Sequence, residues 1–299
     1  MDSVSLVFRE RVAALWKCCD NLYCGECHIR RKIPDGEWTR IARKRRIEFY
    51  VGSVNGKWMY GFGDPEETGA DRYLTMDELK NSPNMKNVVI CIISVFEKWF
   101  NPTVAKLRPL DVDMKVLMKF VLFLSNEPHL HVGHTFNESL ESSEESRLLN
   151  WLQEMQFSQV NFKHYNANYN QLLERQNSRR KATQIGVTSI ESGKEFLEAE
   201  LAAVRIRKFW IVAYLSSYLL DAIVARFLED PSQFGEDYEV SCSFEPKKIK
   251  KILLEMKKTT RFVREYANKK TGTTEFAVEG SNGKVLTITK HGVKWTLSA

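Results

Sequence analysis

The stretch Gln184–Val212, QIGVTSIESGKEFLEAELAAVRIRKFWIV, holds one complete β-α-β unit and decides the fold. It opens on a short run rich in β-branched residues, which favours a buried strand. Apolar residues then recur at the spacing of an amphipathic helix, from Phe196 through Leu201 to Val204. A second apolar and aromatic run, Phe209–Val212, follows closely. The stretch therefore predicts a strand, a helix and a second strand parallel to the first.

The same pair of elements recurs on both sides of this stretch. Strand-like runs that are followed by helical stripes begin near His129, Ser158, Gln184, Arg207 and Tyr238. A repeat of roughly 23 to 31 residues is typical of solenoids, in which each unit buries its apolar face against its neighbours. The run Val88–Phe96, with a helix over Met114–Ser125, fits an earlier and longer turn of the pattern. Because no strict leucine-rich consensus is present, a conventional α/β layer fold is an alternative.

Antiparallel strands are predicted at both ends of the repeats. Asn55-Gly56 separates two alternating runs, Ile47–Ser53 and Lys57–Gly63, and this dipeptide is a strong hairpin signal. Before the hairpin, Ser3–Ile47 has helical spacing and is predicted to be helical. Three alternating runs close the chain and predict a meander that covers the open edge of the last repeat. These runs are Thr274–Val278, Lys284–Thr289 and Val293–Leu297.

We therefore expect an α/β protein with two parts. Residues 1–63 are predicted to form a small helical module with a β-hairpin. Residues 86–299 are predicted to form an irregular, solenoid-like β-α repeat domain with mostly parallel strands, closed by C-terminal antiparallel strands.

The composition and charge of the chain indicate which classes of partner and which compartment to expect. Of 299 residues, 43% are hydrophobic and 27% charged, as in ordinary folded proteins. The formal net charge of +6 is small, and the basic runs Arg43–Arg46 and Lys247–Lys251 are interpreted as solvated surface, so no nucleic-acid partner is expected. Charged residues between Asp2 and Arg11 argue against a signal peptide, and no apolar window reaches about 18 residues, so no membrane partner is expected. Six cysteines without a secretory signal favour reduced thiols in the cytoplasm or nucleus.

A cluster of cysteines near the N-terminus is the first candidate for chemistry. Cys24-x-x-Cys27 has zinc-ligand spacing, and Cys18, Cys19 and His28 lie close by. Strong zinc motifs separate two ligand pairs by a longer loop, whereas these ligands are crowded. We therefore expect ordinary thiols and no bound cofactor. The alternatives are a structural zinc held by Cys18, Cys24, Cys27 and His28, and a redox pair.

Three histidines form the second candidate. His129 and His131 would point to the same side of a strand, with His134 just beyond. No acidic residue has the spacing to complete a metal site, so an exposed strand surface is the expected structure. The sequence also lacks a phosphate-binding glycine loop, a nucleophile elbow and an HExxH motif. No catalytic residue is predicted, and an enzyme of unrecognised class is the least favoured alternative.

The predicted strands alternate between apolar residues that face the core and residues that face outward. With Val160, Ile185, Phe209 and Val240 turned inward, the outward residues form one mixed polar surface, with Trp210 near its centre. A tryptophan set in polar surroundings is typical of a binding hot spot. A shift of one residue in register would reverse every assignment. The predicted partner-binding residues are Gln159, Asn161, Lys163, Gln184, Thr188, Lys208, Trp210, Glu239 and Ser241.

Several segments resemble a nematode-expanded F-box-like family. At the N-terminus these are MDSVSLVF at Met1–Phe8, Trp38-x-x-Ile41-Ala42 and Phe49-Tyr50-Val51. Further along, Glu195-Phe196-Leu197, Ile206-x-Lys208-x-Trp210-Ile211, Arg226-Phe227-Leu228 and the ending Gly272–Leu297 resemble the leucine-rich-repeat-like, F-box-associated region of that family.

The resemblance implies a substrate-recruiting subunit of a cullin-type ubiquitin ligase. In such a protein the N-terminal module docks on the adaptor subunit of the ligase, and the repeats hold the target. The docking residues implied here are Phe8, Val12, Leu15, Trp38 and Ile41. We therefore expect a non-enzymatic protein-interaction adaptor. The alternatives are a protein-binding scaffold without any connection to a ligase, and a zinc-containing protein that uses the Cys18–His28 cluster.

Overall fold

The computed structural model describes residues 45–63, 73–82, 85, 88–97, 106–133, 143–178, 184–244, 262–268 and 271–299. These residues belong to two compact units. Unit 1 comprises the described residues up to Ile93 and those from Lys106 to Asn126, and unit 2 comprises Ser94–Glu97 and the described residues from Glu127 onward. The helix predicted over Ser3–Ile47 lies outside the described residues except at its end. There the prediction is wrong, because a strand begins at Arg45.

Unit 1 is built on the predicted hairpin. Asn55 and Gly56 form the turn with φ of 53° and 75°, the positive values that a tight hairpin turn requires. The strands of the unit lie in the order β3-β1-β2-β4. Its elements are β1 (Arg45–Val54), β2 (Lys57–Gly63), α3 (Met76–Lys80), the first part of β3 (Val88–Glu97, of which Ser94–Glu97 belong to unit 2), β4 (Arg108–Pro109) and α4 (Met114–Leu124).

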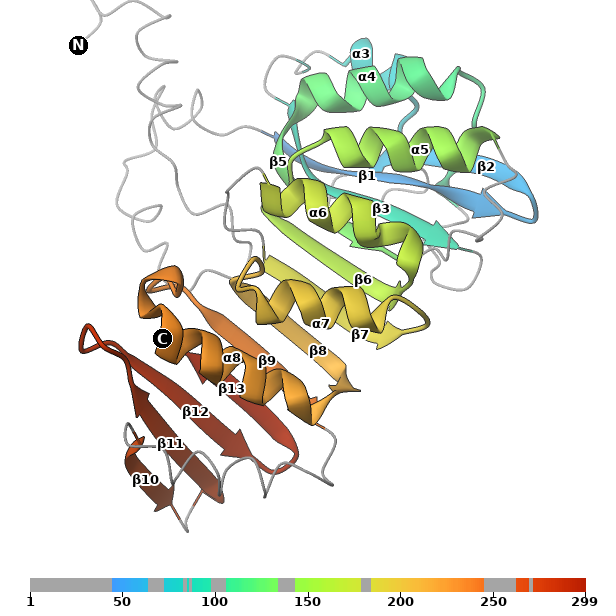
Figure 1. The fold of residues 1–299 in the computed structure, drawn as a ribbon. Coiled ribbons are helices and arrows are strands. Elements are labelled where there is room, and N and C mark those ends of the chain that lie inside the picture. The colour runs from blue at the N-terminus through green and yellow to red at the C-terminus, as the bar shows by residue number, and fades with distance from the viewer. Residues whose placement is uncertain are drawn as a thin grey trace, which may run out of the picture. The chain divides into compact units, whose positions relative to one another are not determined.

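Unit 2 contains the predicted β-α repeats, and its five repeat strands are parallel and neighbour one another in sequence order (Figure 1). Each strand begins within four residues of its predicted start. The strands are β5 (Ser125–Val132), β6 (Gln159–Tyr165), β7 (Gln184–Ile190), β8 (Lys208–Leu215) and β9 (Glu239–Phe244). The helices between them are α5 (Ser143–Glu154), α6 (Asn170–Ser178), α7 (Lys194–Ala202) and α8 (Ser217–Glu229).

The helices of the repeats lie on one face of these strands, which we call the helix face. Figure 1 shows α6, α7 and α8 side by side along β6 to β9. In a doubly wound α/β sheet the helices cover both faces and the strand order reverses at one point. Sequential strand order with helices along one face is instead the arrangement of a solenoid. The α/β fold class predicted from the sequence is therefore confirmed.

The core of unit 2 lies between the strands and the helices that cover the helix face. Leu130, Val160, Ile185, Phe209 and Val240 pair in register across the five parallel strands, and none is more than 2% exposed. Each helix also contributes leucine or isoleucine side chains that are no more than 3% exposed. These include Leu148, Leu152, Leu172, Leu197, Leu201, Leu219 and Ile223. The continuous interior is what a stack of units, none able to bury its own apolar face, requires.

Hydrogen bonds repeat at equivalent positions where the strands begin. The backbone N–H of Gln184, the first residue of β7, donates to the carbonyl of Ser158, which precedes β6, at 3.1 Å. Two strands further on, the N–H of Glu239, the first residue of β9, donates to the carbonyl of Arg207, which precedes β8, at 2.7 Å. The recurrence of one contact along the chain shows that the β-α units are structural repeats and not only similar in sequence spacing.

Unit 2 ends in antiparallel strands, of which the described residues contain four. These are β10 (Phe262–Asn268), β11 (Thr273–Glu279), β12 (Val285–His291) and β13 (Lys294–Ser298). Their order from the repeats outward is β9-β13-β12-β11-β10, so the last strand of the chain pairs with β9. The three predicted strands are confirmed, and β10 was not predicted. The helical stripe expected after the strand near Tyr238, which comprises Ile249, Ile252, Leu253 and Met256, lies outside the described residues.

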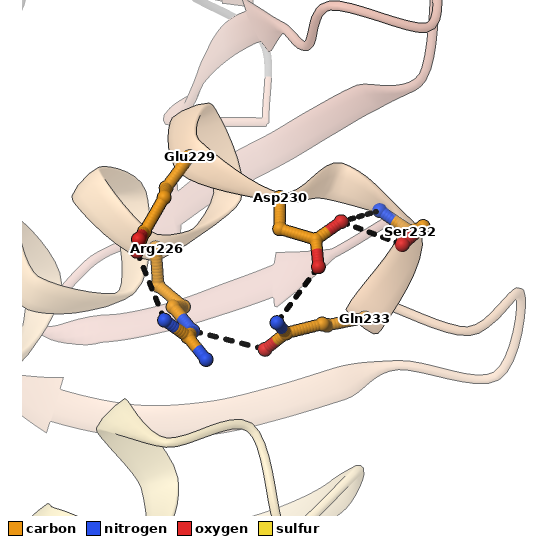
Figure 2. A network of polar contacts seen from close by, with 5 residues as sticks. All are labelled: Arg226, Glu229, Asp230, Ser232 and Gln233. Carbon is orange, nitrogen blue, oxygen red and sulfur yellow. Dashed lines mark hydrogen bonds and ion pairs between the residues drawn. The ribbon is translucent and has the colours of Figure 1, made fainter.

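A polar network holds the turn after α8, where η5 (Pro231–Gln233) begins (Figure 2). The carboxylate of Asp230 accepts hydrogen bonds from the N–H of Ser232 at 3.1 Å, from its hydroxyl at 2.5 Å and from the amide of Gln233 at 2.8 Å. Arg226 donates to Gln233 Oε1 and to Glu229 Oε2, both at 2.9 Å. All five polar side chains are thus engaged with one another in fixing this turn.

The same turn contacts the C-terminal strands. A Cβ at Gly280 would lie 2.5 Å from Cγ of Pro231, so the glycine permits a close approach to η5. Lys284 Nζ donates to the carbonyl of Phe234 at 2.6 Å. The turn that follows α8 therefore contacts the β11–β12 connection. These contacts link the antiparallel strands to the repeats.

Candidate functional site

The strand residues that do not face the core form a second surface in unit 2, which we call the polar face. Its middle row runs across the strands through His131, Asn161, Gly186, Trp210 and Ser241, each paired in register with the next. The antiparallel strands extend the row through Thr296, Thr289 and Glu275.

Two further rows flank the middle row. One runs through His129, Gln159, Gln184, Lys208 and Glu239. The other contains Lys163 and Thr188, which lie opposite each other between the pairs Phe162–Val187 and His164–Ser189 of β6 and β7. All nine predicted partner-binding residues therefore lie on the polar face, although their role in binding stays a prediction. One of them differs from expectation, because Ser241, between the larger Trp210 and Thr296, is only 5% exposed.

Trp210 lies flat across its neighbour in the middle row. A Cβ at Gly186 would lie 2.3 Å from Cε2 and Cζ2 of the indole and 2.5 Å from Oδ1 of Asn161. The ring thus occupies the space that a side chain at position 186 would fill, and it reaches toward Asn161. A glycine inside a strand pattern indicates such a close approach. Gly186 is therefore a site residue that was not predicted, although its signal was present in the sequence.

Beside the indole, three polar side chains form a connected group. The amide of Gln159 donates to Asn161 Oδ1 at 3.1 Å, and Asn161 Nδ2 lies 3.4 Å from Nε2 of His131. Desolvation lowers the pKa of His131, and the nearby His129 adds to the effect. A neutral imidazole has one acceptor nitrogen, and Nε2 takes this role when it receives the amide N–H of Asn161. The group therefore presents fixed donors and acceptors next to an aromatic ring.

The strand that carries Trp210 continues the polar face with two apolar residues. Trp210 pairs with Ser241, and Tyr214 pairs with Ser243, so β8 contains two more residues than β9 between these pairs. Val212, between them, is 64% exposed and Tyr214 is 53% exposed. Neither residue was among the predicted partner-binding residues, and the shift in register between β8 and β9 cannot be recognised from alternation alone.

A serine, a histidine and a glutamate meet where β6 and β7 end, and this group is the arrangement closest to a catalytic triad among the described residues. His164 Nδ1 lies 2.8 Å from Ser189 Oγ and 3.6 Å from Glu191 Oε1. A triad uses opposite ring nitrogens for the nucleophile and the acid, whereas Nδ1 contacts both residues here. Ser189 also donates its proton to Lys163 O at 3.0 Å, so its hydroxyl accepts from His164. The geometry does not activate the serine.

The candidate metal ligands are only partly placed. Cys18, Cys24, Cys27 and His28 lie outside the described residues, as does His134. Within the described ranges, no group of three or more His, Cys, Asp or Glu side chains is placed to hold a metal ion. Of the two cysteines in these ranges, Cys242 is fully buried and its pKa is raised well above the ordinary value, chiefly by desolvation.

The docking residues implied by the family resemblance, which are Phe8, Val12, Leu15, Trp38 and Ile41, also lie outside the described residues. Among the described helices, none combines the length and the apolar character needed to cross a bilayer.

Comparisons with other proteins give no further assignment. No family model matches the chain, and no curated protein or solved structure matches it either.

Proposed function

We propose that the protein is a non-enzymatic adaptor that binds a protein partner on the polar face of its β-α repeats. The observation that carries the proposal is the position of Trp210, held flat across Gly186 beside the Gln159–Asn161–His131 group. An aromatic ring that is already held in place loses little conformational freedom on binding, and tryptophan is enriched among the residues that dominate binding energy.

The fold supports the same proposal. Purely parallel strands normally have both faces covered, because βαβ crossovers place helices on them. In unit 2 the repeat helices follow one face, so the polar face of β5 to β9 offers a wide surface of fixed backbone (Figure 1). Polar and amide side chains around one aromatic anchor form the pattern of a protein-binding surface, with polar groups available for hydrogen bonds to a partner.

We further propose that this adaptor serves a cullin-type ubiquitin ligase in the cytoplasm or nucleus, with the target held by the polar face. The support for this part is the F-box-like resemblance. It is tested by mixing the full-length protein with the purified adaptor subunit of such a ligase and following complex formation by gel filtration. Complex formation that is lost on Leu15→Glu supports the proposal. A folded full-length protein that forms no complex contradicts the ligase role and leaves a scaffold role.

The binding surface itself is tested by site-specific cross-linking in cells. A photo-reactive amino acid is placed at Thr188 or at Glu239, both exposed on the polar face, and as a control at Tyr218, which is 60% exposed on α8. We expect the same discrete cross-linked protein from both polar-face positions, lost on Trp210→Ala, and not from position 218. Cross-linking that occurs equally from α8, or that is indifferent to Trp210→Ala, contradicts the proposal.

A further inference from the structure

We infer that the polar face selects an acidic protein segment that carries a large apolar side chain, and that Val212 and Tyr214 form the apolar part of the site. This inference rests on the proposed function and deepens it by naming the chemistry of the partner. It is carried by three observations: the extra residues of β8, the exposure of two of its side chains, and the charges that flank them.

The apolar part of the site is a strip along one strand. Trp210, Val212 and Tyr214 alternate along β8 and so point to the same side, and the pairing of Tyr214 with Ser243 fixes that side as the polar face. Val212 is 64% exposed and Tyr214 is 53% exposed. Large apolar side chains that are exposed together and rimmed by polar residues mark interaction sites more often than side chains exposed singly.

The charges on both sides of this strip are positive. Lys163 lies opposite Thr188 on the polar face, on β6, two strands away from β8. Lys294 lies on the row of Tyr214, two strands away across Ser243. At about 4.8 Å between neighbouring strands, the backbone of each lysine lies about 10 Å from β8, a distance that the lysine side chain and a side chain of the bound segment can span together.

The acidic residues of this region are matched by neighbours or lie elsewhere on the face. Glu239 pairs in register with Lys208, in the first flanking row. Glu191, beyond the end of β7, lies 3.6 Å from His164. Glu275 lies in the middle row on β11, beyond β13 and β12. Along the described row that contains Tyr214, the one fixed charge is that of Lys294.

The complementary occupant therefore has carboxylates on both sides of an apolar side chain. The carboxylates would face Lys163 and Lys294, and the apolar side chain would cover Val212 and Tyr214. A nucleic acid would satisfy the lysines but not the aliphatic Val212, which offers no stacking surface. We therefore commit to a protein segment.

The test measures binding of labelled peptide pools to the full-length protein by fluorescence polarisation. One pool has Leu, Phe or Trp at the centre and Asp or Glu on both sides. A second pool replaces the acids by Lys or Arg, and a third keeps the acids but has Ser or Gly at the centre. A labelled single-stranded oligonucleotide is the fourth probe. We expect the acidic, apolar pool to bind at least about tenfold more tightly than the other three probes.

Variants then locate the site. The double variant Val212→Ser with Tyr214→Gln, and the double variant Lys163→Glu with Lys294→Glu, should each weaken binding of the first pool by about tenfold or more. Matched controls are Tyr218→Gln on the helix face and Lys115→Glu on α4, both at exposed positions. These controls should leave binding unchanged. Higher salt should also weaken binding of the first pool, because exposed charges are screened.

Several results would overturn the inference. These are equal binding of all pools, preference for the basic pool, binding of the oligonucleotide as tight as that of the first pool, and no binding of any probe. Unchanged binding of the first pool to both double variants would also overturn the inference. If cross-linking from the polar face still requires Trp210, such a result removes the acidic-segment inference and leaves the proposed function standing. If cross-linking is also indifferent to Trp210→Ala, both fail.

Discussion

Gly186 and Trp210 are coupled by the space that they share. Because a Cβ at position 186 would lie 2.3 Å from the indole, Gly186→Ala must displace the ring, which is expected to cost about 1–3 kcal/mol of unfolding free energy. In the background of Trp210→Ala the clash with the ring is gone and only the end of the Asn161 side chain, which can move, lies too close, so Gly186→Ala should then cost less. A double-mutant cycle followed by denaturant unfolding measures this coupling. Additive effects of the two substitutions would show that the ring does not lie over the glycine.

For two buried tyrosines, removal of the hydroxyl is expected to change the stability of the protein in opposite directions. The Tyr238 hydroxyl is buried and has no hydrogen-bond partner among the described residues, and desolvation raises its pKa well above the ordinary value. The Tyr165 hydroxyl is also buried but donates to Asn170 Oδ1 at 2.7 Å. Removing an unsatisfied buried hydroxyl is neutral or stabilising by up to about 1 kcal/mol, whereas removing a satisfied one costs about 0.5–1.5 kcal/mol.

We therefore expect Tyr238→Phe to keep or raise the thermal midpoint and Tyr165→Phe to lower it, when both are measured by calorimetry. A loss of stability in Tyr238→Phe equal to that in Tyr165→Phe would mean that the Tyr238 hydroxyl is hydrogen-bonded after all.

Among the elements, the η5 turn predicts a dependence of stability on pH. Hydrogen bonds from the side chains of Ser232 and Gln233 lower the pKa of Asp230 below its ordinary 3.8. A carboxylate with a lowered folded pKa contributes stability above its unfolded pKa and loses that contribution as pH falls through its folded pKa. Asp230→Ala should therefore lower the thermal midpoint at neutral pH, and the difference from wild type should shrink in acid.

The measurement is a series of thermal unfolding curves for both proteins from neutral pH down to about pH 2, below the ordinary range of aspartate. A difference between wild type and Asp230→Ala that stays constant over this range would contradict the role of the carboxylate charge in the network of Figure 2.

Elements whose signal is local were predicted from the sequence. The Asn55-Gly56 turn and the alternation of β6, β7 and β8 depend on residues close in the chain, and each is present. Two features depend on pairing between distant segments and were not predicted. The meander was expected at the open edge of the last repeat, but not which of its strands pairs with β9, and that strand is β13. The extra residues of β8 appear only against β9. Periodicity within one segment carries no information about its partner.

The same limit applies to the candidate site. Trp210 and its eight companions could be assigned to one face, because alternation fixes the side to which a strand residue points. Val212 and Tyr214 were not assigned to either side, because they are apolar residues in the run that follows Trp210, and their exposure identifies them as surface. The sequence could thus indicate which face binds, but not where its apolar part lies.

For the whole molecule, the central claim is that unit 2 binds a protein through the polar face and uses the helix face only to close its core. The most direct measurement compares the affinity of the purified cross-linked partner for full-length wild type, for Trp210→Ala and for Tyr218→Ala, with folding of each checked by circular dichroism. The account predicts that Trp210→Ala weakens binding by about thirtyfold or more, as expected for a hot-spot residue, while Tyr218→Ala leaves the affinity unchanged. Equal affinities of wild type and Trp210→Ala, or a larger loss on Tyr218→Ala, would contradict it.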